Sequence, residues 1–350
     1  MRHLESLLSD VTERMKTIQN TSVIETCKIS TIDIDKWEWP QGVGLYGMMR
    51  RYRRTGDDRV LNWINAWIET NLKRGIPERN VNTTTPMLTV AQVGMMTGRN
   101  DYLDLCREWA DWIIKKFPRT KYGGFQHVTS DVTNKEQLWD DTLFMTVLFL
   151  AQMGVIDGRK DYIDECEYQF LLHVRYLTDR ATGLWYHGWT FDGNHNFANA
   201  LWGRGNCWIT AFIPDFLEMT GISCGSRPLM TAVLQNQAES LMRFQSENGM
   251  WHTLLDDETS YCETSVTAGF AYGLLKGVRM GLLNKSFQAA AIKAAYAVID
   301  NISPDGTVEN VSSGTAMGQN LQFYRDVPQY PMAYGQALTI LMLEELMKYQ

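Results

Sequence analysis

The sequence predicts an all-α protein built as a single (α/α)6 barrel, in which six helical hairpins supply twelve helices. Three observations lead to this fold class. Apolar residues recur at helical spacing along most of the chain. Helices that are apolar on one side alternate with helices that are apolar nearly all round, and a glycine follows a helix at several turns. The chain has 350 residues, of which 45% are hydrophobic. No Pro/Gly/Ser-rich stretch divides it, so we expect residues 1–350 to form one domain.

Six helices have one apolar side and are expected to form an outer ring. In residues 58–73, for example, Val60, Ile64 and Trp67 repeat at the spacing of one helix face. A helix of this kind packs on one side and leaves the other side to water. The outer helices are expected near residues 1–20, 58–73, 100–117, 160–177, 227–247 and 285–301.

Six further helices are expected to form an inner ring. Segments such as MLTVAQVGMM and LFMTVLFLAQM are apolar nearly all round, which indicates burial on all sides. Outer and inner helices alternate six times, so a closed ring is the simplest arrangement, with an open solenoid of helix pairs as the alternative. Short β-ribbons are allowed around 123–130 and 183–190. The inner helices are expected near residues 41–55, 86–97, 140–153, 206–220, 263–281 and 331–348.

Five glycines mark the turns from an inner helix to the next outer helix. A glycine just past a helix end supplies the left-handed residue that closes the last turn. The Asp or Asn residues that follow suit the first position of the next helix. These turns are therefore expected to be tight and polar. The marker glycines are Gly56, Gly98, Gly154, Gly221 and Gly281.

The loops that run from an outer to an inner helix are long and rich in aromatic residues. They contain seven of the twelve tryptophans and four of the six histidines. Each loop leads into an inner helix, so all six should open onto one face of the barrel, where helix N-termini add partial positive charge. Long loops in a compact domain usually bind or catalyse, so we expect the functional site there. The loops are residues 37–42, 80–86, 123–141, 183–206, 249–264 and 308–331.

The pair Asp140-Asp141 stands at the start of a very apolar inner helix and is the strongest candidate for chemistry. Either residue could cap the helix, but two acids beside Trp139 exceed what capping requires. We expect one carboxyl to cap the helix and the other to face the barrel axis. Burial among apolar walls would raise the pKa of the second carboxyl and suit it to general acid catalysis.

The fourth loop and the residues just after it combine flat aromatic rings with polar groups. The rings of Trp202 and Trp208 match the apolar face of a sugar, and His187 matches its hydroxyls. Arg204 stands between two glycines, looks exposed, and could pair with a carboxylate through two hydrogen bonds. A tryptophan-rich plug without a ligand is the alternative interpretation.

Other loop residues carry weaker signals. Trp37 and Trp39 suit either a hydrophobic contact at the helix start or ligand stacking, and His127 follows a glycine pair. Asn82 lies among threonines that could be turn formers. The fifth-loop residues are most simply interpreted as solvated charge: His252, Asp256, Asp257 and Glu258.

Composition excludes several classes of function. The net charge is −7 without a basic cluster, which argues against nucleic acid. No apolar run is long enough to span a membrane, and the N-terminus lacks a secretion signal, so we expect a cytoplasmic protein with free thiols. Neither metal-ligand spacing nor a dinucleotide fingerprint is present, so we expect no metal and no cofactor.

Six segments of the chain are similar to glycoside hydrolase family 105, the unsaturated rhamnogalacturonyl hydrolases. The resemblance spans almost the whole chain, and it is most specific in the third and fourth loops. It implies an (α/α)6 barrel and a substrate that is a small pectin-derived oligosaccharide ending in 4,5-unsaturated galacturonic acid. We expect a monomer or a homodimer. The segments are WPQG (39–42), GGFQH (123–127), QLWDDTLFM (137–145), YHGW (186–189), WGRGNCW (202–208) and ETSVTAGFAYGLLKGVRMGLL (263–283).

The resemblance also implies roles for individual residues. Asp141, which precedes Thr142, would be the catalytic acid and base, and Arg204 would hold the uronate carboxylate or its neighbouring hydroxyls. Related unsaturated glucuronyl hydrolases carry a second acid in the second loop, where this chain offers Asn82. The remaining expected contacts with substrate are Trp39, His127, Trp139, Asp140, His187, Trp202 and Trp208.

The chemistry of such a substrate requires one carboxyl. Protonation of C4 of the vinyl ether gives an oxocarbenium ion, water adds at C5, and the resulting hemiketal opens. Asp141 could donate the first proton and accept one from water. Three alternatives remain open: an unsaturated glucuronyl hydrolase, a conventional inverting glycosidase that adds Asp192 or Glu263 as a second acid, and a non-catalytic scaffold that binds sugar or protein.

Overall fold

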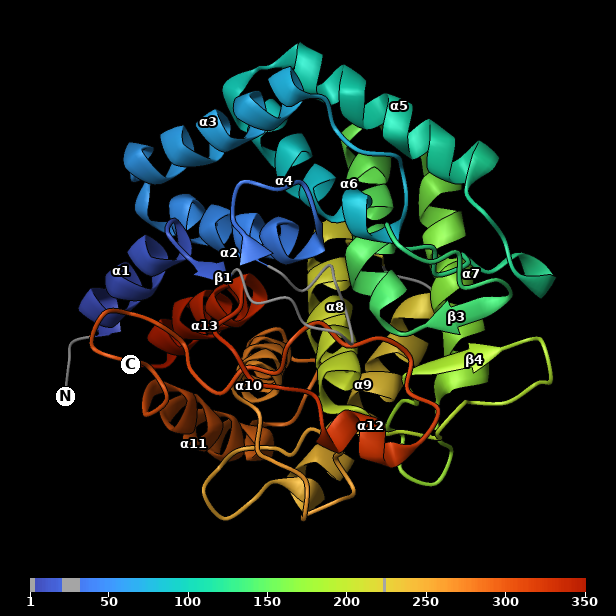
Figure 1. Ribbon diagram of the computed structural model, residues 1–350, viewed down its shortest axis with the longest axis vertical. Helices are drawn as coiled ribbons and strands as arrows, with labels where there is room; N and C mark the ends of the chain where they lie inside the picture. The colour runs from blue at the N-terminus through green and yellow to red at the C-terminus, as the bar shows by residue number, and fades with distance from the viewer. Residues whose placement is uncertain (1–3, 21–31, 223–224) are drawn as a thin grey trace.

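The computed structural model describes residues 4–20, 32–222 and 225–350, and these form two concentric rings of helices (Figure 1). Each inner helix packs against the next one around the ring, and α13 packs against both α10 and α2. The ring is therefore closed, and the open solenoid is excluded. The inner helices are α2 (Trp39–Thr55), α4 (Val81–Thr97), α6 (Leu148–Ile156), α8 (Gly203–Thr220), α10 (Thr264–Arg279) and α13 (Ala333–Leu346).

The outer ring matches the predicted amphipathic segments. In α3, the residues Val60, Ile64 and Trp67 are buried along one stripe, while every residue of α4 from Val81 to Gly94 is buried. The predicted contrast between the two rings is confirmed. The outer helices are α1 (Leu4–Met15), α3 (Asp58–Arg74), α5 (Asn100–Lys116), α7 (Lys160–Leu177), α9 (Ser226–Phe244) and α11 (Gln288–Ile299).

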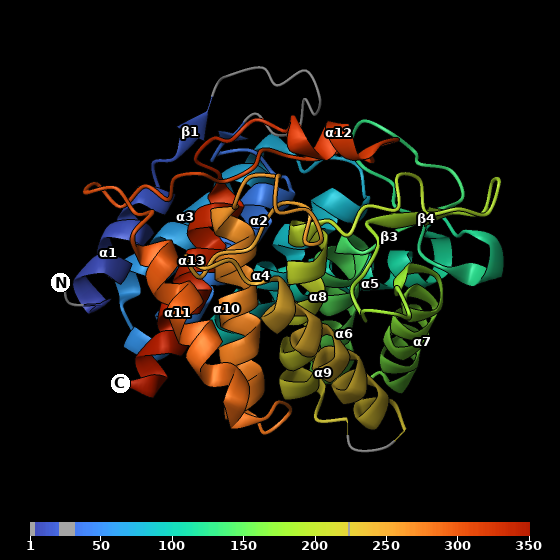
Figure 2. The ribbon, with the colours of Figure 1, turned by 90° about the horizontal axis from the view of Figure 1, so that it is seen from below.

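The long loops gather at one end of the barrel, as predicted, and carry several short elements (Figure 2). One is an antiparallel ribbon of β3 (Gln137–Trp139) with β4 (Gly188–Thr190), in which Leu138 is paired with Trp189. The ribbon therefore joins the third loop to the fourth. The prediction of a ribbon near 183–190 is confirmed, whereas 123–130 contributes only an isolated bridge from Phe125 to Arg119.

Two more short elements at this end were not predicted. The two-residue strands β1 (Gln19–Asn20) and β2 (Ile32–Asp33) pair with each other, and the helix α12 (Leu321–Arg325) lies in the sixth loop. Among the described helices, none combines the length and the apolar character that a transmembrane span requires. Three of the four described cysteines are buried, and all four are free thiols. Cys27 and Cys224 lie outside the described residues.

The second loop is shorter than predicted, because α4 begins at Val81 rather than near residue 86. Asn80 accepts a hydrogen bond from the backbone N–H of Thr83, and the Thr83 hydroxyl accepts one from the backbone N–H of Asn80. This reciprocal cap satisfies donors of the first turn. Pro86 lies inside the helix and packs closely on Gly42 of α2. A side chain at position 42 would place its Cβ atom 2.6 Å from the proline nitrogen, so the contact requires glycine.

The glycine turns are confirmed at three sites where the cap donates its N–H to the preceding turn, Gly56, Gly98 and Gly221. Gly281 also has a left-handed φ of 69°. Gly154 is a correction: it lies inside α6, and Gly158 takes the left-handed position instead. Caps by a following Asp or Asn are also rarer than expected. Asp57 caps α3, but α5 and α7 follow Arg99 and Arg159, which form no side-chain cap.

Candidate active site

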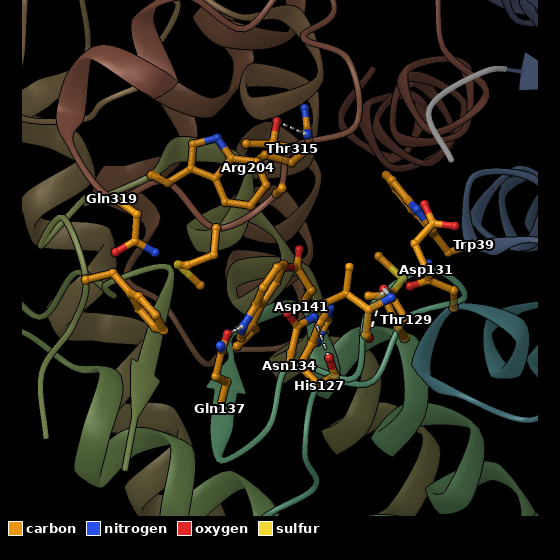
Figure 3. Close-up of a pocket in the computed structure, with 18 residues that line it drawn as sticks. Trp39, His127, Thr129, Asp131, Asn134, Gln137, Asp141, Arg204, Thr315 and Gln319 are labelled. Atoms are coloured by element: carbon orange, nitrogen blue, oxygen red, sulfur yellow. Dashed lines mark hydrogen bonds between the residues drawn. The ribbon is translucent and has the colours of Figure 1, made fainter. Parts of the chain in front are cut away.

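A pocket of about 370 Å³ opens at the loop end of the barrel (Figure 3). Its walls come from the first to the fourth loops and the sixth. Seven of the ten predicted site residues line it: Trp39, Asn82, His127, Trp139, Asp141, Trp202 and Arg204. The other three, Asp140, His187 and Trp208, are buried behind the wall.

The β3–β4 ribbon positions the two aspartates. The backbone N–H of Asp140 donates to the carbonyl of His187 at 3.1 Å, which continues the ribbon pairing one residue beyond Trp139. The helix begins at Asp141 and is π-helical over Leu143–Val147. Neither carboxyl oxygen of Asp140, the residue before it, accepts a hydrogen bond from a described residue. The expectation that one aspartate caps this helix is therefore wrong, and Asp141 lines the pocket.

Asp140 is fully buried, and neither of its carboxyl oxygens has a hydrogen-bond partner in the described part of the chain. It packs against Gly205 of α8, where a Cβ atom would come within 2.0 Å of Oδ2. Burial, reinforced by the charge of Asp141, raises the pKa of Asp140 well above its usual value. The buried position of Asp140 therefore favours its neutral, protonated form.

Asp141 shows the opposite shift. Burial raises the pKa of this carboxyl, but the interaction with His187 and the nearby charge of Arg204 outweigh burial and hold the pKa below its usual value. The expected raised pKa therefore falls on Asp140 and not on Asp141. Of the two neighbouring acids, Asp140 therefore holds a proton more readily than Asp141.

His187 supports Asp141 from behind the pocket wall. Its Nε2 atom lies 3.6 Å from Oδ2 of Asp141, and its Nδ1 atom lies 2.8 Å from the Tyr324 hydroxyl. That hydroxyl accepts the N–H of Gly318 at 3.1 Å, and its own proton has two acceptors in reach, Nδ1 and the sulfur of Met317 at 3.7 Å. A thioether is the weaker acceptor, so the proton points at Nδ1. The imidazole proton then sits on Nε2 and faces Asp141. Burial lowers the pKa of His187, which favours the neutral ring.

His127 also lines the pocket as a neutral ring. Its Nδ1 atom lies 2.7 Å from the Thr142 hydroxyl, and its ring stacks on Trp139 with 4.2 Å between centroids. Burial lowers the pKa of His127 to about 3. The residue can therefore exchange hydrogen bonds with a hydroxyl group but carries no charge near pH 7.

Arg204 is buried rather than exposed, which corrects the prediction. One terminal nitrogen donates to the backbone carbonyl of Ser312 at 2.9 Å and to its hydroxyl, and the other donates to the carbonyl of Ser313 and the hydroxyl of Thr315 at 2.8 Å each. Its Nε–H has no described partner. The guanidinium therefore anchors the sixth loop and cannot form the expected pair of hydrogen bonds with a carboxylate.

The aromatic residues divide into lining and supporting groups. Trp39 lines the pocket and stacks on Tyr334, with 4.7 Å between ring centroids. Trp208 contacts Trp39 edge-on, with 6.5 Å between ring centroids. Trp208 also packs on Phe144 and is completely buried, so it supports the wall. Trp37 donates its indole N–H to the carbonyl of Thr83 at 2.8 Å, which identifies it as structural.

Sequence reasoning missed two parts of the pocket. Thr129, Asp131 and Asn134 line it from the third loop, and the sixth loop adds Thr315, Ala316, Met317 and Gln319. These residues carry no recognisable pattern beyond their position in long loops. Glu38 is a further missed acid. Burial raises its pKa in spite of hydrogen bonds to Ser130 and Asn82, so an acid does stand next to Asn82.

Neither of the second acids considered for an inverting glycosidase lines the pocket. Glu263 is buried and accepts hydrogen bonds from Val266, Ser265 and Ser312 as the cap of α10. Asp192 lies in a different groove. The fifth loop also stays outside the pocket, and Asp257 pairs with Arg325 at 2.7 Å.

Asp140, Asp141 and His187 could in principle hold a cation, because their ligand atoms lie within 4.8 Å of one another. Three ligands are the usual minimum for an open metal site. The raised pKa of Asp140 opposes this use, because the residue would have to lose its proton in a fully buried position. The absence of a metal requirement stays a prediction.

Comparison with known proteins agrees with this geometry. The family model described as Glycosyl Hydrolase Family 88 matches residues 10–350. The chain is 32% identical to the unsaturated rhamnogalacturonyl hydrolase YesR of Bacillus subtilis over 332 residues, which cover 94% of this chain and 95% of the relative.

Solved structures place the chain in the same family. Crystal structures of possible GH105 family members from Salmonella enterica and Klebsiella pneumoniae are 44% and 45% identical to the chain, with TM-scores of 0.95 and 0.94. Each match covers 99% of this chain and 94% and 93% of the respective structure. An unsaturated glucuronyl hydrolase from Bacillus sp. GL1, at 18% identity and a TM-score of 0.74, shares the fold. The predicted kinship with family 105 is confirmed, and the chain belongs to the glycosyl hydrolases of family 88.

Proposed function

We propose that the chain is an unsaturated rhamnogalacturonyl hydrolase, which releases terminal 4,5-unsaturated galacturonic acid from pectin-derived rhamnogalacturonan oligosaccharides. The observation that carries this proposal is the position of Asp141. It lines the same pocket as the stacked His127–Trp139 pair and Trp202, and Nε2 of the buried His187 lies 3.6 Å from its carboxyl. The similarity to YesR over nearly the whole chain supports the rhamnogalacturonan class of substrate.

Substrate binding favours the protonated form of Asp141 that the first step requires. The pKa of Asp141 lies below its usual value, but the uronate carboxylate of the substrate brings a second negative charge beside it, so that Asp141 can take a proton from solvent. A like charge raises the pKa of a carboxyl, so Asp141 takes up a proton as the substrate enters. The positive charge of Arg204 attracts the same uronate.

Asp141 then protonates C4 of the unsaturated ring, and an oxocarbenium ion forms across C5 and the ring oxygen. Asp141, now a carboxylate, accepts a proton from water as that water adds at C5. The resulting hemiketal opens and releases the neighbouring sugar. A single carboxyl therefore serves both steps, whereas hydrolysis of an ordinary glycosidic bond requires two opposed carboxyls.

We further propose that this reaction takes place in the cytoplasm. The four described cysteines are free thiols, three of them buried. Such cysteine usage is typical of a reducing compartment.

The decisive experiment follows the near-ultraviolet absorbance of the conjugated uronate. Loss of this absorbance is expected for the parent with unsaturated rhamnogalacturonan disaccharide. The saturated disaccharide lacks the chromophore, so its cleavage is followed by chromatography of the products, and none is expected. Asp141→Asn should lose about 10²–10⁴ in kcat and keep its fold. Asp131→Asn, the other carboxyl in the pocket, is the matched comparison and should lose far less.

Two results would contradict the proposal. Equal losses at both acids, with cleavage of saturated substrate, would establish an inverting glycosidase instead. Faster turnover of unsaturated glucuronyl disaccharides from glycosaminoglycans would establish the glucuronyl specificity.

A further inference from the structure

A second concave surface lies beside the active site, at the outer side of the β3–β4 ribbon. One groove of about 610 Å³ is lined by residues that include Lys121, Lys135 and Phe191, and another of about 480 Å³ is lined by residues that include Tyr176 and Trp189. Ring contacts of 4.8 Å between Tyr176 and Phe191 and 5.3 Å between Tyr176 and Trp189 join the two. We call this surface the outer groove and define it by Tyr122, Tyr176, Trp189 and Phe191 with the cations Lys121, Lys135, Arg175 and Arg180.

One aromatic residue of the outer groove, Tyr122, is exposed and has a strained backbone conformation. Tyr122 is 57% exposed and lies 6.4 Å from Tyr176 in a stacked arrangement. Its φ of 65° is a conformation that a bulky residue normally avoids. A large apolar ring that is both strained and exposed indicates a ligand surface rather than a packing requirement.

Other strained residues lie around the same loops. Of the seven non-glycine residues with positive φ in the described part of the chain, six belong to the third and fourth loops or the turn that precedes them. Strained backbone of this kind clusters at ligand sites. The six are Tyr122, Asn134, Glu136, Asn194, Phe197 and Asn199.

The charges of the outer groove favour an anion. All four cations are exposed, and none of them forms an ion pair with a described residue. Lys121 lies over the ring of Tyr122 at 5.1 Å, and Arg175 lies over the ring of Tyr176 at 5.5 Å.

Three acids also line the two grooves, namely Glu136, Asp179 and Asp192. Glu136 accepts the backbone N–H of Lys121 at 2.7 Å, and Asp179 accepts hydrogen bonds from Ala181 and Thr182. These neutral donors fix the carboxylates but leave their charge in place. In a chain with a net charge of −7, four exposed cations against three acids still give the outer groove a small excess of positive charge.

We propose that the outer groove is a second carbohydrate-binding site, which takes an acidic oligosaccharide. The sugar faces stack on the aromatic rings, and the carboxylates face the four cations. The site is adjacent to the active site, because segment 134–137 forms part of the wall of both. Asn134 and Gln137 line the pocket, while Lys135 and Glu136 line the groove. Only the class of sugar rests on the proposed function.

The experiment measures binding without turnover. The Asp141→Asn chain is titrated by calorimetry with a saturated oligogalacturonate trimer and, separately, with its methyl ester. The groove variant adds Tyr122→Gly and Lys135→Gln, since glycine accepts the left-handed backbone at residue 122. The control adds Tyr296→Ala and Lys285→Gln, which alter an exposed ring on α11 and a cation just before that helix, across the barrel from the ribbon (Figure 1).

We expect the trimer to bind about fivefold more weakly to the groove variant and unchanged to the control, since exposed charge and ring contacts are each modest. The methyl ester should bind weakly to all three chains. In the background that retains Asp141, the groove changes should leave turnover of an unsaturated disaccharide unaltered. If the groove changes slow turnover of longer unsaturated oligosaccharides but not of the disaccharide, the outer groove holds the far end of the substrate. If they weaken only the binding of the saturated trimer, the outer groove holds a separate sugar molecule.

Equal trimer affinity in parent and groove variant, or equal affinity for trimer and methyl ester, would overturn this inference whatever the activity. Absence of turnover together with intact groove binding would instead count against the proposed function alone. Melting temperatures of the variants should match the parent, and Tyr176→Ala gives an independent groove change if residue 122 proves sensitive.

Discussion

The hydroxyl of Tyr324 lies 2.8 Å from Nδ1 of His187, and this contact connects the sixth loop to the carboxylate of Asp141. The hydroxyl accepts a hydrogen bond from the backbone N–H of Gly318 and can donate its own proton to the imidazole. A residue more than 180 positions away from Asp141 in sequence thus favours the tautomer in which the imidazole nitrogen facing that acid carries the proton.

Tyr324→Phe should lower kcat about tenfold with little change in KM, because His187 loses the hydrogen bond that fixes its tautomer. The N–H that faces Asp141 from 3.6 Å would then be present less often, and the pKa of Asp141 would rise. Since kcat falls as pH rises through the pKa of the acid, the alkaline limb of the kcat profile should move to higher pH. A profile that stays in place while kcat falls would point to a purely structural role for the hydroxyl.

Asp140→Asn should change the pH dependence of stability. The pKa of Asp140 is raised in the folded protein, so its contribution is fully present below the unfolded pKa and declines as pH rises toward the folded pKa. The decline is about 1.4 kcal/mol per pH unit above about pH 4. The stability of Asp140→Asn relative to the parent should therefore improve with rising pH. Urea unfolding at several pH values measures this slope, and the exposed Asp256→Asn should not reproduce it.

Gly205→Ala should destabilise the fold by about 1–3 kcal/mol, because the new methyl group would overlap the Asp140 carboxyl. The double variant Gly205→Ala with Asp140→Ala removes the overlap and should recover part of the loss. Thermal unfolding of the parent, the two single variants and the double variant gives the coupling free energy between positions 140 and 205. Additive losses would show that the methyl group clashes with something else.

Arg204→Lys keeps the charge but cannot reproduce four hydrogen bonds to the segment 312–315. We expect faster amide hydrogen exchange in residues 312–319 and a KM raised at least about tenfold, since the sixth loop forms part of the pocket. Arg59→Lys, an exposed pair with Asp57, serves as the control. Unchanged exchange in the sixth loop would mean that other contacts hold it.

The parts of the fold that depend on local pattern could be predicted from the sequence. One-sided and all-round apolar helices differ within a single window, so both rings were placed within a few residues. The start of α4 was misplaced because Pro86 suggests a first turn, whereas the cap at Asn80 lies five residues earlier. The partner strand of β4 was missed because its pairing joins segments about 50 residues apart.

In the candidate site, too, local patterns could be predicted from the sequence and contacts between distant segments could not. Convergence of the loops predicted that Asp141, His127, Trp39 and Trp202 share one pocket. The burial of Arg204 could not be predicted, because its partners begin at Ser312, 108 residues away, in a segment without a motif. The reversed pKa shifts of Asp140 and Asp141 depend on which carboxyl meets Gly205 and which meets His187, and two adjacent acids look alike in sequence.

The closed ring has a consequence for biosynthesis. Helix α13 seals the barrel between α10 and α2, and Thr315 to Gln319 complete the pocket in the loop that leads to it. During translation the ring and the pocket therefore stay incomplete until residues 315–346 have emerged from the ribosome. Premature termination anywhere upstream of this seal would yield a product without a working catalytic chamber, however well its earlier hairpins had formed.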